Sequence, residues 1–226
     1  MKGKLIVIEG TDGSGKATQS GQLSVRLAAE GVPVRKVDYP NYQSQSSALV
    51  KMYLNGEFGN RPEAVNAYAA SAFYAVDRIA SYKKDWEDFY LNGGVVIADR
   101  YTTSNMIHQA VKIADQAAKK SYLDWLWDFE FAKCGLPVPD KVFFLAMPPA
   151  ASQELLCGRE KKSGGTQDIH EQDSQYLAYC FANACEIAEQ YNWHTIECLH
   201  NGTIKTIEQI HSEIYQAVRD FLGRAY

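Results

Sequence analysis

The chain has 226 residues, of which 46% are hydrophobic and 22% are charged, and this composition fits one globular domain with a full apolar core rather than two independent domains. A formal net charge of -4 at pH 7 argues against a general attraction to nucleic acid or to an anionic membrane, so phosphate binding is expected only at a local site. The 5 cysteines include no C-x-x-C pair, which predicts reduced thiols rather than a disulfide framework or a zinc knuckle. The first apolar run, residues 5–8, is too short for a signal peptide or a spanning helix, and we expect a cytoplasmic protein.

Short apolar runs alternate with longer amphipathic stretches along the chain. Runs of this length between turn residues are typical of buried strands, and the stretches between them have the length and spacing of helices. Alternating strands and helices predict a parallel sheet covered by helices. We therefore expect an α/β fold with five parallel strands at residues 5–8, 34–37, 95–98, 142–145 and 194–198.

The first predicted strand leads directly into a glycine-rich loop and then into a helix in which Leu23, Leu27 and Ala28 share a face. Glycines allow backbone N–H groups to surround phosphate oxygens, the helix presents its positive end, and a lysine adds charge near the transferred group. This is the context that a P-loop requires. We predict that it binds ATP through Gly10, Thr11, Asp12, Gly13, Ser14, Gly15, Lys16, Ala17 and Thr18.

Two residues of this loop need explanation. The motif places Ser or Thr after its lysine to bind Mg²⁺, but here Ala17 stands there and Thr18 is one place later, rotated by about 100° around the helix. The ion is then expected to be held through water, by Thr18, or by carboxylates elsewhere, and a loop that binds nucleotide without turnover is the alternative. Asp12 would repel phosphates unless it faced another ligand, such as a sugar hydroxyl of the phosphoryl acceptor or a metal.

The third predicted strand is followed by Asp99 and Arg100. Since the carboxyl ends of parallel strands face the ligand crevice, both residues should face the same space as the P-loop. The Arg100 fork suits two phosphate oxygens, while Asp99 could hold magnesium-bound water or orient the arginine. We therefore predict an acceptor-phosphate site here, with Asp99 as the candidate metal residue.

A polar stretch over residues 158–172 interrupts two helical patterns and contains Arg159, Lys161 and Lys162. Such a stretch is typical of a mobile lid, although an ordinary solvated loop is the alternative. A bound phosphate could be contacted by any of these three cationic side chains when the lid closes.

The last segment is a predicted packing helix. Apolar residues recur there at three- and four-residue spacing on one helical face; they are Ile204, Ile207, Ile210, Ile214, Val218 and Phe221.

The order and spacing of these motifs resemble those of thymidylate kinases along nearly the whole chain. The matching pieces are residues 8–16 (IEGTDGSGK), 38–42 (DYPNY), 74–78 (YAVDR) and 99–101 (DRY), with Asn105 following. The resemblance implies a P-loop NTPase-type domain over residues 1–226, Mg²⁺ with ATP as co-substrate, and a homodimer. It also implies transfer of a phosphoryl group from ATP to dTMP.

On the phosphate side, the resemblance implies that Lys16 and Arg100 are catalytic and that Arg100 bridges the donor and acceptor phosphates. Asp12 would contact the 3′-hydroxyl of dTMP, and Tyr39 with Pro40 would form the wall beside the acceptor phosphate. Some relatives have an arginine after this proline, where the chain has asparagine, so the dependence on Arg100 should be tighter.

The resemblance also assigns a role to the lid. The family draws an extra cation either from the P-loop or from the lid, and residues 11–14 contain no lysine or arginine. The resemblance therefore implies that the lid brings Arg159 or one of its lysines onto the transferring group, with Arg159 as the catalytic candidate.

On the base side, the resemblance implies that Arg78 recognises a thymine carbonyl and that Asn105 bonds the polar edge of the base. The base would stack on Tyr74, where the family usually has phenylalanine, and Phe73 is the neighbouring alternative. By the residues alone, Phe73 and Tyr74 could instead be core residues, and Arg78 could pair with Asp77 or another acid.

The sequence thus predicts an ATP-dependent nucleoside monophosphate kinase that makes dTDP from dTMP. The alternatives are a kinase for another nucleoside monophosphate or for a deoxynucleoside, and a nucleotide-binding module without turnover. Neither nucleic acid nor a membrane is an expected partner.

Overall fold

The computed structural model describes residues 2–153, 155, 169 and 174–223. Its main sheet contains five strands, all parallel, in the order β2-β3-β1-β4-β5. The bounds are β1 Lys4–Glu9, β2 Val34–Asp38, β3 Val95–Asp99, β4 Lys141–Ala146 and β5 His194–Glu197. The predicted five-stranded parallel sheet is therefore confirmed, with each strand within one residue of its expected bounds.

The strand order indicates where a ligand can bind along the edge of the sheet. Strand β1 lies between β3 and β4, with Ile8 opposite Asp99 and Glu9 opposite Phe144. The chain thus moves to opposite sides of β1, and in open parallel sheets ligands bind beyond the carboxyl ends of the strands at such a point. The P-loop and the segment after Asp99 both begin there.

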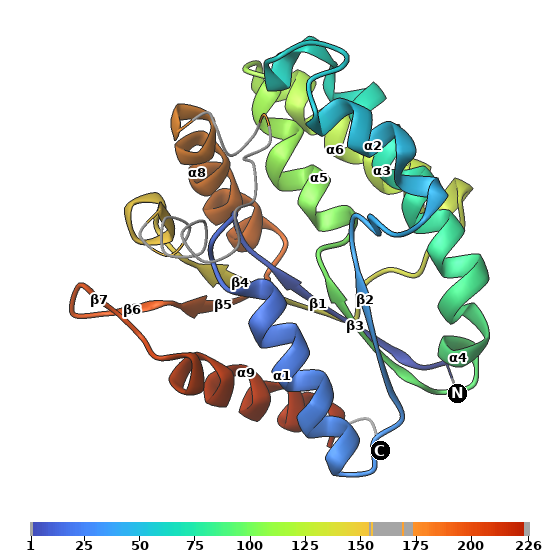
Figure 1. Cartoon of the computed structure of the whole chain (residues 1–226), viewed down its shortest axis with the longest axis vertical. Helices are drawn as coiled ribbons and strands as arrows, with labels where there is room; N and C mark the ends of the chain where they lie inside the picture. The colour runs from blue at the N-terminus through green and yellow to red at the C-terminus, as the bar shows by residue number, and fades with distance from the viewer. Residues whose placement is uncertain (1, 154, 156–168, 170–173, 224–226) are drawn as a thin grey trace.

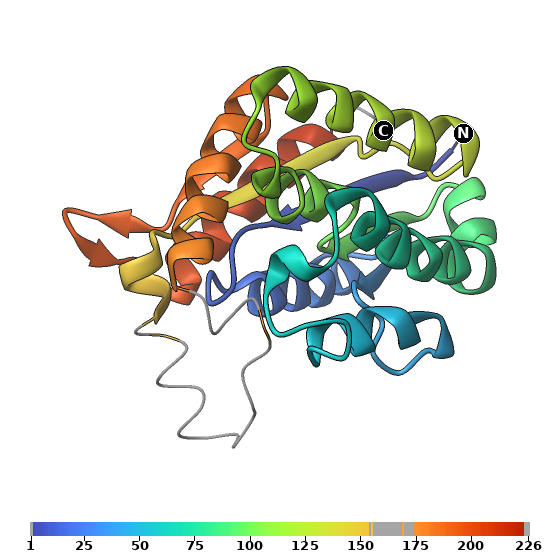
Figure 2. The same cartoon turned by 90° about the horizontal axis from the view of Figure 1, so that it is seen from above.

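Helices cover both faces of this sheet (Figures 1 and 2). Helices α1 and α9 lie on one face, while α5 and α8 pack on the other (Figure 1). The described α-helices include α1 Lys16–Ala29, α2 Ala48–Leu54, α3 Ala67–Ser81, α4 Glu87–Leu91, α5 Thr102–His108, α6 Gln116–Trp127, α8 Ser174–Gln190 and α9 Ile207–Leu222. Residues 149–153 are also helical. Three short 3₁₀ turns, η1 Gln45–Ser47, η2 Pro62–Ala64 and η4 Ala110–Lys112, and two π-helical turns, η3 Tyr82–Trp86 and η5 Asp128–Lys133, lie between them. Among the described residues, no helix is long and apolar enough to cross a membrane.

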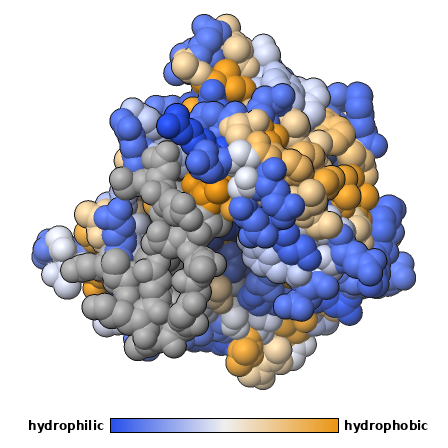
Figure 3. All heavy atoms as spheres, turned by 45° about the horizontal axis from the view of Figure 1, so that its top comes forward, coloured by the Kyte–Doolittle hydropathy of each residue, from blue (hydrophilic) through white to orange (hydrophobic). Residues whose placement is uncertain are grey.

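The side formed by α2 and α3 carries apolar groups on its surface. Leu49 of α2, together with Tyr68 and Val76 of α3, is exposed. Figure 3 shows apolar residues gathered on the upper right of the molecule, the side on which Figure 1 places these two helices.

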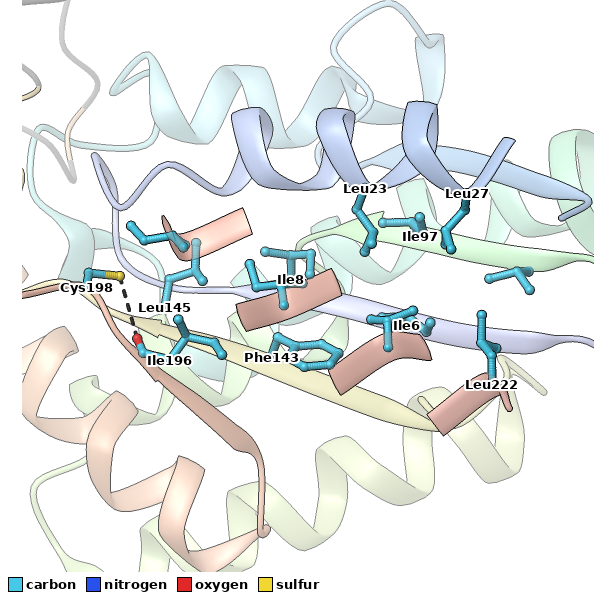
Figure 4. Close-up of a cluster of buried hydrophobic side chains, with 14 of the residues drawn as sticks. Ile6, Ile8, Leu23, Leu27, Ile97, Phe143, Leu145, Ile196, Cys198 and Leu222 are labelled. Atoms are coloured by element: carbon cyan, nitrogen blue, oxygen red, sulfur yellow. Dashed lines mark hydrogen bonds between the residues drawn. The ribbon is translucent and has the colours of Figure 1, made fainter. Parts of the chain in front are cut away.

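The core divides along the faces of the sheet. Ile6 and Ile8 of β1 point toward Leu23 and Leu27 of α1, together with strand residues of β3, β4 and β5 (Figure 4). The intervening Leu5 and Val7 belong to a second cluster on the opposite face, as the two-residue period of a strand requires. Both faces of β1 are therefore buried, which fixes its register and the position of the loop that follows it.

Two sequence predictions need correction at the C-terminal end. Ile204 was expected at the start of the last helix, but it lies in β7 Thr203–Ile204, which pairs with β6 Leu199–His200. Helix α9 begins later because Thr206 caps it, accepting from the Gln209 N–H while the Gln209 side chain accepts from the Thr206 N–H. Cys198 follows the end of β5 instead of belonging to it.

Candidate active site

The P-loop is shaped by glycines at its two ends. Gly10 has φ of 155°, and a Cβ placed on it would lie 2.5 Å from the Ser14 hydroxyl, so a larger residue would clash within the loop. Gly15 has φ of 89° at the N-cap of α1, in the left-handed region that favours glycine. The predicted glycine pattern thus serves the tight turn between β1 and α1.

Lys16 lies in this turn with its charge largely removed from solvent. The residue is 7% exposed, and its Nζ donates to the Thr11 carbonyl at 2.8 Å. Burial, followed by repulsion from Arg100, lowers the pKa of Lys16 to about 8. A bound polyphosphate would raise the pKa of Lys16 again, because its negative charge stabilises the protonated amine.

Arg100 reaches across the sheet edge to the P-loop. Its Nη2 forms an ion pair with the Asp12 carboxylate, and its Nη1 lies 3.4 Å from the Gly10 carbonyl, 3.2 Å from Ser104 Oγ and 3.2 Å from His108 Nε2. Burial opposes the charge on Arg100, but Asp12 and two further carboxylates outweigh it and raise the pKa. The guanidinium is therefore a fixed cation between the loop and α5.

A buried carboxylate, Glu9, holds the backbone that carries Arg100. Glu9 is fully buried; its Oε1 accepts from the Tyr101 N–H at 3.3 Å and from the hydroxyls of Thr103 and Ser104 at 2.7 and 2.8 Å. Arg100 itself has φ of 65°, a left-handed conformation that costs an ordinary residue about 1 kcal/mol. The hydrogen bonds that Glu9 accepts from the residues after Arg100 offset this cost and hold the backbone with the Arg100 side chain directed toward Asp12.

A cavity that opens to solvent lies beside this ion pair, and we call it the acceptor cavity. It contains about 510 Å³ of empty space, its open mouth included. The cavity collects most of the residues predicted on the acceptor side, and its lining includes Asp12, Tyr39, Pro40, Tyr74, Arg78, Arg100 and Asn105. Phe73, the alternative stacking residue, does not line the cavity and packs against Phe58, with ring centroids 5.7 Å apart.

The Arg78 guanidinium is paired with Glu130, a residue that the sequence motifs did not indicate. Its Nε donates to Glu130 Oε2 at 2.7 Å and its Nη2 to Oε1 at 2.5 Å. Burial opposes the charge on Arg78, but the charge of Glu130 and its hydrogen bonds raise the pKa of the guanidinium. Asn105 Nδ2 lies 3.3 Å from the same carboxylate.

Asp77, considered as a partner of Arg78, bonds elsewhere. Its carboxylate accepts from the Asn41 N–H at 2.7 Å and from the Ser46 hydroxyl at 2.6 Å. Asp77 therefore fastens α3 to the segment after Pro40, which forms part of the cavity wall.

A larger donor cavity opens on the other side of the ion pair. It holds about 1600 Å³ of empty space, open solvent included, and is lined by residues 12–19 of the P-loop, by Asp99 and by parts of the C-terminal segments. Five residues line both cavities: Asp12, Tyr39, Pro40, Tyr42 and Arg100. The two cavities thus meet at the Asp12–Arg100 pair.

The donor cavity contains oxygen groups suited to a hard cation. The side chains of Asp99 and Thr18 bring oxygens to its lining, whereas Ala17, which also lines it, has none. Ala17 and Thr18 are exposed. Ser14 also lines the cavity, and its buried hydroxyl has no hydrogen-bond partner among the described residues. Within that part of the chain, no group of three or more His, Cys, Asp or Glu side chains could hold a metal by itself, so an ion here would also need water or phosphate oxygens.

Some residues of the site escaped the sequence reasoning, and others lie outside the described structure. Glu9 lies within a matched motif, but nothing in the sequence indicates its role. No sequence motif includes Glu130, His108 or Gln109. The lid candidates Arg159, Lys161 and Lys162, and most of 158–172, lie outside the described residues. Ile169 is described: it is buried, and its N–H donates to the Leu54 carbonyl at 3.3 Å.

Comparison with known proteins gives a family match over most of the chain. A family model described as thymidylate kinase matches residues 8–214. The chain belongs to the thymidylate kinase family. The resemblance seen in its motifs is therefore confirmed.

Individual members of the family show how far the similarity extends. The thymidylate kinase of Mycobacterium tuberculosis strain H37Rv is 34% identical over 188 residues, which cover 82% of this chain and 86% of the relative. The thymidylate kinase of Plasmodium falciparum is 27% identical over 220 residues, covering 94% and 93%. A solved structure of thymidylate kinase from Candida albicans superposes with a TM-score of 0.72 at 24% identity over 97% of this chain and 92% of that one, which shows a shared fold.

Proposed function

We propose that this chain transfers the γ-phosphoryl group of ATP to dTMP, giving dTDP and ADP, as a step toward dTTP. The observation that carries the proposal is the meeting of the donor and acceptor cavities at Asp12 and Arg100. A kinase must hold two phosphates end to end, and a cation at the junction offsets their repulsion. Membership of the thymidylate kinase family supports dTMP as the acceptor.

The residues have separate tasks in the transfer. An oxygen of the dTMP phosphate bonds to the γ-phosphorus while the bond to the β–γ bridging oxygen breaks, and ADP leaves. No side-chain nucleophile is needed, so alignment and charge neutralisation supply most of the catalysis. Lys16 would neutralise the donor phosphates, and Arg100 would bind the acceptor phosphate and the transferring group.

Mg²⁺ fits the donor side. Asp99 and, through water, Asp12 are the residues that would hold it, since both are oxygen ligands in the donor cavity. Held there with ATP, Mg²⁺ would supply positive charge that offsets the charge of the donor phosphates. Ala17 cannot serve as a ligand, which leaves the carboxylates, Thr18 and water.

The lid supplies a further part of the proposal. Residues 11–14 contain no cation, so we assign the additional charge on the transferring group to Arg159. The substitution Arg159→Ala should lower turnover far more than the affinity for dTMP, with Lys161→Ala and Lys162→Ala as matched variants. Unchanged turnover in all three would contradict a catalytic role for the lid.

We also propose a single catalytic domain that forms a homodimer and acts in the cytoplasm. The exposed apolar side chains Leu49, Tyr68 and Val76 support the side formed by α2 and α3 as the contact, because such patches are typical of protein interfaces. Light scattering should give twice the chain mass for the wild type and the chain mass for Val76→Glu. A monomeric wild type would reject the dimer.

The test of function is ADP release from ATP and Mg²⁺ with a panel of acceptors. We expect turnover with dTMP to exceed that with dUMP, dCMP and dGMP, and none with thymidine, which lacks the accepting phosphate. A preference for another monophosphate would reassign the substrate. Binding of ATP and dTMP without ADP release would make the chain a nucleotide-binding module.

A further inference from the structure

Glu130 is a buried carboxylate that contacts three residues around the acceptor cavity. It is 0% exposed, and its partners are Arg78, the Thr102 hydroxyl at 2.6 Å and Asn105 Nδ2 at 3.3 Å. A buried charge is costly unless it is paired and fully hydrogen-bonded. These donors satisfy that requirement, and two of them, Arg78 and Asn105, line the cavity.

The local helix geometry explains why an acid from this segment turns inward. Glu130 lies in the π-helical turn η5, whose wider spacing changes the direction of the side chains. The neighbouring charges of the same turn stay outside, since Asp128 and Lys133 pair with each other at 2.6 Å and both are exposed. The turn therefore presents one carboxylate to the interior and keeps a separate ion pair at the surface.

Glu130 determines which atoms of Arg78 remain for a ligand. The carboxylate accepts from Nε and Nη2, which fixes the plane of the guanidinium. Nη1, which lies 3.5 Å from the Tyr101 carbonyl, is the nitrogen with no bond to Glu130. Because a guanidinium has only donors, a ligand that meets Nη1 must present an acceptor, such as a carbonyl oxygen.

Glu130 also orients the amide of Asn105. Because Nδ2 donates to the carboxylate and, at 3.5 Å, to the Ser71 carbonyl, the oxygen is the atom of the Asn105 amide that can accept from a ligand. The cavity thus combines a donor from Arg78 with an acceptor from Asn105. A pyrimidine with a carbonyl at C4 and an N–H at position 3 matches this pair, whereas cytosine presents an amino group and an unprotonated nitrogen at the same places.

We propose that Glu130 is a positioning residue that makes the site select a 4-keto pyrimidine over a 4-amino pyrimidine. This inference rests on the proposed function and deepens it. Glu130 acts through Arg78 and Asn105 and does not touch the substrate itself.

The test compares Glu130→Gln with Lys133→Ala, an exposed change in the same turn. The ratio of kcat/KM for dTMP to that for dCMP should fall about 10-fold or more in Glu130→Gln, the loss expected for misplacing one charged hydrogen bond. The loss should lie mainly in KM for dTMP. Lys133→Ala should leave the ratio and the turnover unchanged.

A double-substitution cycle separates positioning from general damage. In an Arg78→Ala background, Glu130→Gln should cause a much smaller further fall in the ratio, because only Asn105 is then left for Glu130 to position. An unchanged ratio in the folded single variant, or an equal additional fall in the double variant, would overturn the proposal. If Glu130→Gln does not fold, Thr102→Val removes one hydrogen bond to the carboxylate and should lower the ratio less but in the same direction; an unchanged ratio there counts against the proposal.

Calorimetric binding of dTMP and dCMP without ATP distinguishes this inference from the function on which it rests. If the wild type binds dTMP but releases no ADP, the proposed reaction fails while the affinity ratio still tests Glu130. Equal wild-type affinities for the two nucleotides would reject the selection itself.

Discussion

The Arg100 guanidinium and the Asp12 carboxylate form an ion pair that joins the end of β3 to the P-loop after β1. Both residues line the donor cavity and the acceptor cavity. Binding of either substrate must therefore rearrange or share the contacts of this pair. The first two predictions test its two members separately.

The substitution Arg100→Lys should lower kcat by about 100-fold or more, the usual loss when a group that stabilises the transferring charge is removed. Lysine keeps the charge but lacks the planar fork that can contact Asp12 and phosphate oxygens together. The affinity for ATP should change much less, since Lys16 and the loop stay in place. Steady-state kinetics with both substrates varied would measure this, and a kcat within threefold of the wild type would refute the assignment.

The substitution Asp12→Asn should weaken dTMP binding about 10-fold, the loss expected for one charged hydrogen bond. The decisive comparison uses 3′-deoxy-dTMP, which lacks the hydroxyl assigned to Asp12. The wild type should bind this analogue more weakly than dTMP, whereas Asp12→Asn should bind the two about equally. A variant that keeps the full wild-type preference for dTMP would show that Asp12 does not contact the hydroxyl.

Binding of ATP should take up protons near pH 8. The pKa of Lys16 is lowered to about 8 by burial and Arg100, so the amine of the free protein loses its proton as the pH rises through that value, and bound phosphates restore it. At pH 8 the expected uptake is about half a proton, falling to almost none at pH 6. Calorimetry in two buffers of different ionisation enthalpy would measure it.

Lys112 provides the control for this titration. Burial also lowers its pKa to about 8, but its Nζ bonds to Tyr53 and the Val65 carbonyl and it lines neither cavity. Lys112→Met should therefore retain the proton uptake. Its disappearance in this variant would assign the proton to Lys112 instead of Lys16.

The lowered pKa of Lys16 also has a consequence for stability. Between about pH 8 and its ordinary value of 10.5, the unfolded chain holds more protons at this position than the folded chain. The contribution of Lys16 to the free energy of unfolding should therefore rise with pH across that window.

The magnesium requirement of the wild type should depend on Asp99, because Ala17, the residue after Lys16, has no oxygen ligand in its side chain. Asp99→Asn should raise the Mg²⁺ concentration for half-maximal activity by about 10-fold, since a charged oxygen ligand is lost. Ala17→Ser should lower it by supplying a hydroxyl at the usual position of the motif. Equal magnesium curves for Asp99→Asn and the wild type would exclude Asp99 as a ligand.

The sheet and the P-loop could be predicted because they depend on local patterns. Both faces of β1 are buried, so its sequence is a continuous apolar run, and the following glycines are required by the turn into α1. The position of the segment after β3 could be predicted as well, because the carboxyl end of β3 and the P-loop lie at the same edge of the parallel sheet.

Glu130 could not be predicted because its partner Arg78 is 52 positions away and its segment has the composition of an ordinary amphipathic helix. Only the π-helical turn brings this acid inside, and no residue pattern marks such a turn. The choice between Tyr74 and Phe73 could not be made from the sequence either. Adjacent residues on a helix point about 100° apart, and only the packing of α3 shows that Tyr74 is the one that faces the cavity.

The most direct test of the account is transfer of label from γ-labelled ATP to dTMP, measured by separating the products. We expect labelled dTDP to form with the wild type only when dTMP and Mg²⁺ are present, and Arg100→Lys to form it at least about 100-fold more slowly. No labelled dTDP from a folded wild type that binds both nucleotides, or label released only as inorganic phosphate, would contradict a site in which Asp12 and Arg100 join donor and acceptor.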